Sequence, residues 1–350
     1  MNPIGSRPAR EAVTPFSTFT VPTVFGTIPT FLGAEPVRDL GALAGFDAVI
    51  GGLPWEGSNT WGGYSGCEQT PKACRAASLR LGSGYLPEHD VDVMSNLALG
   101  DLGDLPTFPN DTERTHASFR EAAAQVFASR AVPVFFGGDH SVTYPILQAL
   151  AARHPGRVGL LHFDAHLDNA DDYCGDRYAR NTPLRRIAEL PLMDPAKIVS
   201  FGIRGPRNSP SQMQFARDRG VQVFTMAEVR REGLAGALAR AREIVCHGTD
   251  GYYVTVCSDI IDYAFNPGGP ADFGGLSSTD MLEALFALAQ GPMLGLDLVE
   301  VYPRLDSREI SMHLMAWLAV YGLAGLAVRL SARPGLRVGG TLEGTGPRLP

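Results

Sequence analysis

Short apolar runs alternate with longer amphipathic stretches along most of this chain. Eight runs are apolar at consecutive positions and rich in β-branched residues, which predicts buried parallel strands. They lie at 47–53, 97–101, 132–136, 158–164, 198–203, 221–225, 252–259 and 294–300. Between them, apolar residues at steps of three and four predict helices at 112–129, 142–153, 234–246, 278–289 and 309–328. Thr112 and Ser278 are the candidate N-caps of two of these helices.

Strands and helices that alternate in this way predict an α/β fold. We expect a three-layer αβα sandwich around a mostly parallel eight-stranded sheet. Residues 1–40 are rich in Pro, Thr and Phe and have no lasting period. They predict an N-terminal arm that lies on the body of the protein or on a neighbouring subunit. No linker interrupts the remainder, so 41–350 is expected to be a single domain.

Composition narrows the functional classes. The net charge is −7 and no basic stripe is visible, which argues against a nucleic-acid partner. The longest apolar run, 314–328, is shorter than the roughly 20 residues that span a bilayer, so we expect a buried helix and no membrane. The five cysteines form no CxxC pair, and no apolar segment follows the N-terminal arginines. These features predict a cytoplasmic protein.

Imidazoles and carboxylates gather where three predicted strands end, which is where ligands bind in such sheets. Asp164, His166 and Asp168 alternate, so an extended chain would place them on one face. Groups of this kind crowd together stably when a cation joins them. His140 and Asp259 follow two other strands, and the mixture of ligands suits a divalent transition metal. Five candidate ligands exceed the needs of one ion, which predicts a two-metal site.

Each segment also has a simpler interpretation when it is taken alone. The string 137–141, Gly-Gly-Asp-His-Ser, is compatible with a tight turn capped by Asp139. Asp259 is compatible with a cap or a turn residue. The occurrence of all three segments at strand ends favours the metal site.

Several segments resemble motifs of the ureohydrolase (arginase/agmatinase) family. Residues 137–140, 164–168 and 257–262 are similar to its GGDH and DAHxD motifs and to its D-x-D-x-x-D segment. Further similarities lie at 53–57, 70–78 and 99–104, and residues 295–303 closely resemble its D-x-VE-x-x-P strand end. The resemblance covers about 30–329, and the start Thr30-Phe31-Leu32 together with the length looks most like the agmatinase branch.

The resemblance implies an arginase-like fold and two divalent metal ions, Mn or Ni. It implies that the chain cleaves the C–N bond of a guanidino compound, releasing urea or a substituted urea and an amine. Asp164 would bridge the ions, Asp168 would also hydrogen-bond the attacking hydroxide, and Glu300 would receive the guanidinium group. Asp168 and Glu300 are therefore the expected catalytic residues. The metal ligands carried over from the motifs are His140, Asp164, His166, Asp168 and Asp259.

The sequence departs from the family pattern at three places. Cys257 stands where the family has a bridging Asp, so it is either a thiolate ligand that favours nickel or an inert buried thiol beside a weakened site. Arg180 and Asn181 replace the His-Gly of a His-Gly-Thr-Pro loop and are candidate substrate-binding residues. The loop 266–276 also differs. Agmatine is therefore not the default substrate, and a small alkyl guanidine or a biguanide fits as well.

Two alternatives stay open. Cys257 and Arg180 suggest a weakly catalytic or non-catalytic subunit of a heteromeric guanidine or biguanide hydrolase, similar to metformin hydrolase. A binuclear hydrolase of a formimino or other amidine substrate is the second. The expected partners are a small guanidino molecule and either further copies, as a trimer or hexamer, or a paralogous subunit.

Overall fold

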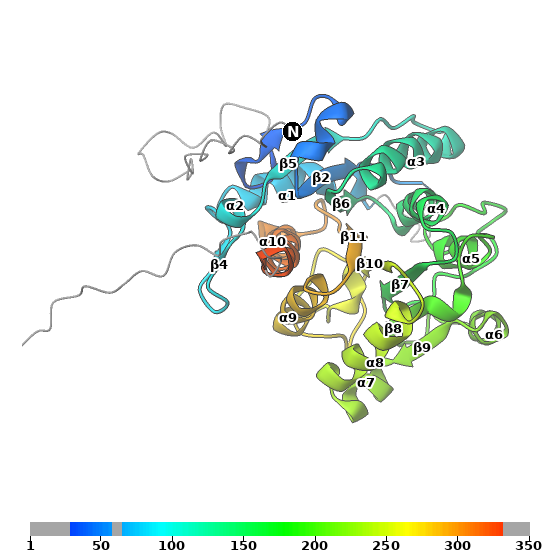
Figure 1. Ribbon diagram of the computed structural model, residues 1–350. Coiled ribbons are helices and arrows are strands. Elements are labelled where there is room, and N and C mark those ends of the chain that lie inside the picture. Colours follow the sequence, from blue (N-terminus) through cyan, green and yellow to red (C-terminus); the bar gives the residue numbers. More distant parts are fainter. Residues whose placement is uncertain (1–28, 58–64, 332–350) are drawn as a thin grey trace, which may run out of the picture.

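A computed structural model describes residues 29–57 and 65–331 of the chain (Figure 1). All eight predicted strands form, and they lie in one sheet of order β1-β5-β2-β6-β11-β10-β7-β8-β9, in which every pair is parallel. Two further short strands, β3 (Tyr85–Leu86) and β4 (Val91–Asp92), form an antiparallel hairpin. The strands of the main sheet are β1 (Glu35–Pro36), β2 (Ala48–Leu53), β5 (Leu99–Asp104), β6 (Val132–Gly137), β7 (Val158–Phe163), β8 (Ile198–Ile203), β9 (Gln222–Thr225), β10 (Gly251–Cys257) and β11 (Met293–Val299).

The sheet has nine strands, and the predicted number of eight was wrong. The ninth strand, β1, contains two exposed residues and no apolar pattern, so nothing in the sequence marks it. It pairs with β5 at the edge of the sheet, where a proline is tolerated. Residues 1–28 of the predicted arm lie outside the described residues. In the following segment, Phe31 and Leu32 are buried.

Helices cover both faces of the sheet and complete the predicted three layers (Figure 1). Helices α3 to α6 share one hydrophobic core with the sheet, and α1 with α7 to α10 share the other. The helices are α1 (Thr70–Ser78), α2 (Val93–Asn96), α3 (Thr112–Ala128), α4 (Thr143–Arg153), α5 (Pro183–Ala188), α6 (Pro210–Arg219), α7 (Met226–Glu232), α8 (Leu234–Cys246), α9 (Ser278–Ala289) and α10 (Ile310–Ser331).

The continuous apolar runs are explained by these two cores. In β7, Val158 and Leu160 pack toward α3 to α6, whereas Leu161 and Phe163 pack toward the other layer. All four side chains are fully buried. Side chains alternate along a strand, so a strand covered on both faces is apolar at every position. Each such residue stabilises the fold by about 1.5–3 kcal/mol through burial.

Two helices begin one residue away from the predicted caps. Asp111, rather than Thr112, is the N-cap of α3, and its side chain accepts a hydrogen bond from Arg114 N. Ser277, rather than Ser278, caps α9 in a reciprocal capping box with Asp280. In both places two adjacent residues are good caps, and the backbone selects the first.

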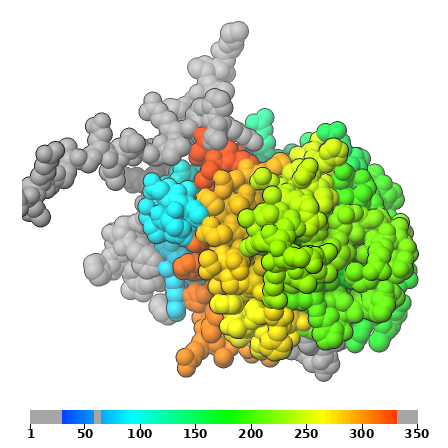
Figure 2. Space-filling model, turned by 90° about the horizontal axis from the view of Figure 1, so that it is seen from below, coloured from blue at the N-terminus to red at the C-terminus, as the bar shows by residue number. Residues whose placement is uncertain are grey.

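Helix α10 carries the apolar run that the sequence assigned to a buried helix. It lies in the longest and most apolar helical segment of the described residues, and by length and composition that segment could cross a membrane. However, 67% of its most apolar window is buried inside the molecule. Figure 2 shows the β3–β4 hairpin, in cyan, beside α10 and α9. There His89 stacks on Phe286 of α9, and Tyr321 of α10 donates a hydrogen bond to Glu88.

Candidate metal centre

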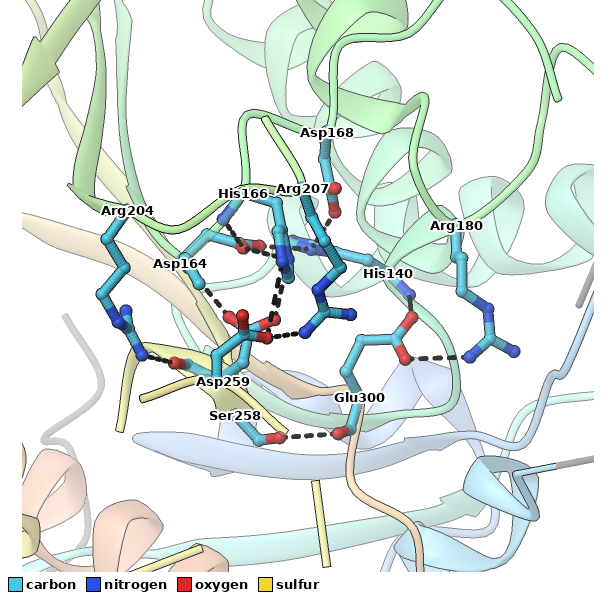
Figure 3. A network of polar contacts seen from close by, with 12 residues as sticks. His140, Asp164, His166, Asp168, Arg180, Arg204, Arg207, Ser258, Asp259 and Glu300 are labelled. Carbon is cyan, nitrogen blue, oxygen red and sulfur yellow. Dashed lines mark hydrogen bonds and ion pairs between the residues drawn. The ribbon is translucent and has the colours of Figure 1, made fainter. Parts of the chain in front are cut away.

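Four neighbouring strands in the middle of the sheet, β6, β11, β10 and β7, end beside one another. His140 follows β6, and Asp164 begins the loop after β7. Asp259 follows β10, and Glu300 follows β11. Since these strands are parallel, their carboxyl ends meet at one edge, and the side chains turn toward a common centre (Figure 3).

The first group of potential ligands surrounds His140. Its Nδ1 atom lies 3.1 Å from Asp164 Oδ2 and 3.0 Å from Asp168 Oδ2. His162 Nε2 lies 3.2 Å from the same Asp164 oxygen. All four residues are buried, and their ligand atoms lie close enough together to hold one ion.

The second group lies on the other side of Asp164. His166 Nδ1 is 3.4 Å from Asp164 Oδ1 and 3.0 Å from Asp259 Oδ2. Asp164 is therefore common to both groups and offers a different oxygen to each. This arrangement fits two ions that share one carboxylate.

The burial and the charges of these ligand atoms are typical of a cation site. His140 Nδ1, Asp164 Oδ2 and Asp259 Oδ2 are buried and make no aligned hydrogen bond. Burial alone would raise the pKa of Asp164, but the imidazoles around it, His140 foremost, hold it well below its usual range. Burial would lower the pKa of His140, whereas its carboxylate neighbours raise it well above the usual value. A divalent cation supplies the same positive charge without these protons, so the residues fit a metal.

Strained backbone and a close approach shape the site. Asp168 and Glu300 both lie in the left-handed region, with φ of 42° and 60°, which is uncommon for residues other than glycine. Gly138 lies against the backbone of Trp55, where a Cβ atom would stand 1.7 Å from the carbonyl oxygen. Asp139 caps the following turn, because its side chain accepts hydrogen bonds from Ser141 N and Ser141 Oγ. The capping interpretation of this segment therefore holds together with the placement of His140 at the site.

Buried hydroxyl groups orient the His140 ring. Its Nε2 atom lies 3.1 Å from Thr255 Oγ1. Thr255 Oγ1 also lies 3.3 Å from the hydroxyl of Thr143, which donates a hydrogen bond to Asp297 Oδ2 at 2.9 Å. A partner on one ring nitrogen fixes which nitrogen faces the ligand, so Thr255 directs Nδ1 of His140 toward the two aspartates.

Glu300 lies beside the ligand groups, and both of its carboxylate oxygens accept hydrogen bonds. Its Oε1 accepts a hydrogen bond from His140 N at 2.8 Å, and its Oε2 accepts one from the Tyr302 hydroxyl at 2.6 Å. Arg180 Nη1 lies 3.1 Å from the same Oε2 atom. Burial raises the pKa of Glu300 to about 7, although Arg180 opposes the rise.

A cavity of about 670 Å³ opens onto this centre. Its lining includes the predicted residues Arg180 and Asn181, whose sequence neighbours begin α5. The volume suits a small organic molecule. Further lining residues are His166, Asp168, Cys257, Asp259, Glu300 and Tyr302.

Cys257 ends β10 and is buried at the wall of this cavity. Burial, followed by the negative charge of Asp164 and Asp259, raises the pKa of its thiol. Among the described residues its sulfur belongs to neither group of close ligand atoms. The structure thus places Cys257 beside both groups and leaves its role as a ligand a prediction.

Sequence reasoning missed several residues of the site. His162 has the same alternating spacing as Asp164 and His166, so the pattern that found those residues also contained it. Asp272 lies 3.4 Å from His166 Nε2 and pairs with Arg207. These residues come from separate loops, so no regular spacing in the sequence indicates that they meet.

Comparison with known proteins identifies the family of this chain. The family model described as the arginase family matches residues 46–324, which include every residue of the two ligand groups. The chain belongs to the arginase family. This confirms the predicted ureohydrolase resemblance, the arginase-like α/β fold and the expectation of an enzyme of this hydrolase class.

Individual members of the arginase family are similar over most of the chain. Guanidinopropionase of Pseudomonas aeruginosa is 37% identical over 287 residues, which are 81% of this chain and 86% of the relative. The structure of proclavaminate amidinohydrolase from Streptomyces clavuligerus has a TM-score of 0.79 and 30% identity, covering 87% of this chain and 99% of that one. The Mn²⁺-containing formiminoglutamase of Trypanosoma cruzi has a TM-score of 0.78 and 27% identity, covering 87% and 100%.

Proposed function

We propose that this chain uses two divalent ions, Mn or Ni, to hydrolyse the C–N bond of a guanidino compound, releasing urea or a substituted urea and an amine. The observation that carries the proposal is the sharing of Asp164 between two groups of buried ligand atoms. Two ions held there supply the positive charge that activates water near neutral pH and polarises the reacting carbon. A Mn²⁺-containing structural neighbour supports manganese.

The protein residues then have distinct roles. Asp168 combines a ligand position with slight exposure at the cavity wall, so it is placed to accept a proton from the attacking water. Glu300 lines the cavity and would be the carboxylate that receives the head group. Arg180 and Asn181 line the same space and would contact the substrate.

Among guanidino compounds, one with a carboxylate tail fits the cavity. Arg185 and Arg207 line its wall beside their carboxylate partners, and their guanidinium groups are the donors that a carboxylate tail would contact. The similarity to guanidinopropionase supports the same class of substrate. Alkyl guanidines and biguanides belong in the same assay panel, because the loop 266–276 differs from the usual family pattern.

The test is a urea-release assay on purified protein loaded with Mn²⁺ or Ni²⁺, combined with metal analysis. We expect close to two ions per chain and urea from at least one guanidino acid. Asp168→Asn is expected to lower turnover by about a thousandfold, since it removes a proton acceptor and a ligand charge. Full activity in that variant, or absence of urea with the whole panel, would refute the proposal.

A second candidate is a weakly catalytic or non-catalytic subunit that pairs with a paralogous chain in a heteromeric guanidine or biguanide (metformin-type) hydrolase. The Arg180–Glu300 ion pair favours it, because the carboxylate for the guanidinium is already engaged. Near-zero metal content would support this alternative.

A homo-oligomer in the cytoplasm is the assembly that we propose for the catalytic form. A formimino substrate is tested by release of formamide and glutamate from formiminoglutamate, in view of the structural similarity to formiminoglutamase.

A further inference from the structure

Glu300 already holds a guanidinium group, and that group belongs to the protein. Arg180 Nη1 lies 3.1 Å from Glu300 Oε2 and 3.4 Å from the Tyr302 hydroxyl. Arg180 Nη2 lies 3.1 Å from Oε1 of Glu56, so one planar guanidinium joins two carboxylates. Figure 3 shows Arg180 and Glu300 turned toward each other beside the ligand groups. We propose that Arg180 is a specificity-determining residue that occupies Glu300 as an internal guanidinium and competes with the guanidinium head group of a substrate.

The hydrogen bonds of Glu300 support this competition. A carboxylate has about four acceptor positions, and a guanidinium bound in the usual parallel manner uses two of them. Glu300 already accepts hydrogen bonds from His140 N, the Tyr302 hydroxyl and Arg180. One position is left, so a substrate guanidinium reaches two acceptors only when Arg180 moves away.

Arg180 is held in this place from its other side. Glu56 accepts hydrogen bonds from the backbone and side chain of Ser65, each at 2.8 Å, and from Gly66 N at 2.8 Å. The side chains of Arg180, Glu56 and Glu300 are only 4%, 4% and 5% exposed. Two anchored carboxylates thus position one buried guanidinium, which makes the pair a built feature of the cavity.

Charge adds a second barrier to a cationic head group. A guanidinium that approaches Glu300 also approaches the positive charge of Arg180, in a region where little water screens the repulsion. A urea group has the same planar shape and no charge, so it avoids this repulsion. We therefore expect the cavity to bind a guanidino compound and its ureido counterpart with similar affinities. The difference would be far larger if Glu300 had no internal guanidinium beside it. This inference rests on the proposed function, because Glu300 matters only when a head group enters the cavity.

The experiment compares two ligands that differ in this charge, 3-guanidinopropionate and 3-ureidopropionate. Their dissociation constants are measured by calorimetry with Mn²⁺-loaded protein in the Asp168→Asn background, which removes turnover. Arg180→His and Arg180→Met remove the internal guanidinium. Arg185→Met is the matched control: Arg185 lines the same cavity and has the same charge, but its ion pairs go to Asp171 and Glu189.

Both Arg180 variants are expected to bind the guanidino ligand about tenfold more tightly or better, with little change for the ureido ligand. The Arg185 variant is expected to leave the ratio of the two constants unchanged. The proposal is overturned if folded Arg180 variants bind the guanidino ligand no more tightly. An equal gain for both ligands also overturns it, because that result indicates a larger cavity alone.

If the Arg180 variants do not fold, the two dissociation constants are compared in protein that keeps Arg180. The two ligands should then bind within about tenfold of each other, and a preference of about a hundredfold for the guanidino ligand would contradict the proposal. Failure of the proposed function is seen separately. It appears as absence of urea release from the chain with native Asp168, whereas these binding constants do not depend on turnover.

Discussion

Thr255 is expected to control metal affinity through the orientation of His140. Its Oγ1 atom lies 3.1 Å from His140 Nε2, and its side chain is 1% exposed. Thr255→Val keeps the shape and removes the hydroxyl, so the ring loses the partner that directs Nδ1 toward Asp164 and Asp168. Partners of this kind contribute about 10- to 100-fold in metal affinity, or roughly 1.4–2.7 kcal/mol. We expect Mn²⁺ binding to weaken by that factor.

The assay is calorimetric titration of metal-free protein with Mn²⁺, together with urea unfolding. Thr143→Val is the matched control. Thr143 is fully buried, lies 3.3 Å from the Thr255 hydroxyl and donates to Asp297, but no hydrogen bond joins it to His140. Both variants should lose about 1–3 kcal/mol of stability, since each removes a buried hydroxyl group and leaves its hydrogen-bond partners unsatisfied. Only Thr255→Val should lose metal affinity, and an equal effect of both substitutions on Mn²⁺ binding would refute the reasoning.

Three further outcomes are expected. Cys257→Asp should strengthen Mn²⁺ retention relative to Ni²⁺, because a carboxylate is the harder ligand; metal analysis after dialysis checks this, and an unchanged preference argues against a thiolate ligand. Gly138→Ala should lower the free energy of unfolding by about 3 kcal/mol, because its Cβ would overlap the Trp55 carbonyl, and an unchanged denaturation midpoint would contradict this. His116 is buried, which lowers its pKa to about 4, so the unfolded chain binds the proton more readily and stability falls as the pH drops from about 6.5 toward 4. His116→Gln should flatten that dependence of the unfolding free energy on pH, and identical slopes would exclude the effect.

The sequence allowed the central part of the sheet to be predicted because burial on both faces leaves a clear apolar run. The run at 158–164 became β7, which ends at Phe163. Strand β1 could not be predicted, because it consists of an exposed Glu-Pro pair without an apolar pattern. It is a strand only because it pairs with β5 in the folded sheet. Helix starts were displaced by one residue where two capping residues are adjacent, as at Asp111 and Thr112.

The ligand residues were found by their position after strands, but the geometric reason was incomplete. The extended strand stops before Asp164, and Asp168 turns back with a φ of 42°. A loop, rather than the alternation of a strand, therefore brings Asp168 to His140. The alternation of side chains along a strand does apply to His162, because this residue lies inside β7. His162 was nevertheless not among the predicted ligands.

Contacts between distant loops were beyond the sequence. Arg180 was identified as a departure from the family pattern, but its pairing with Glu56 and Glu300 joins segments 124 and 120 residues away. No spacing rule links such positions. Only the folded sheet, which places their loops around one cavity, shows that Arg180 pairs with Glu300, the residue predicted to receive the guanidinium group.

The most direct test is anomalous X-ray diffraction at the manganese edge from crystals of the protein reconstituted with Mn²⁺. Two peaks are expected on opposite sides of Asp164, one beside His140 and Asp168 and the other beside His166 and Asp259. A single peak, or peaks that do not share Asp164, would contradict the two-ion centre.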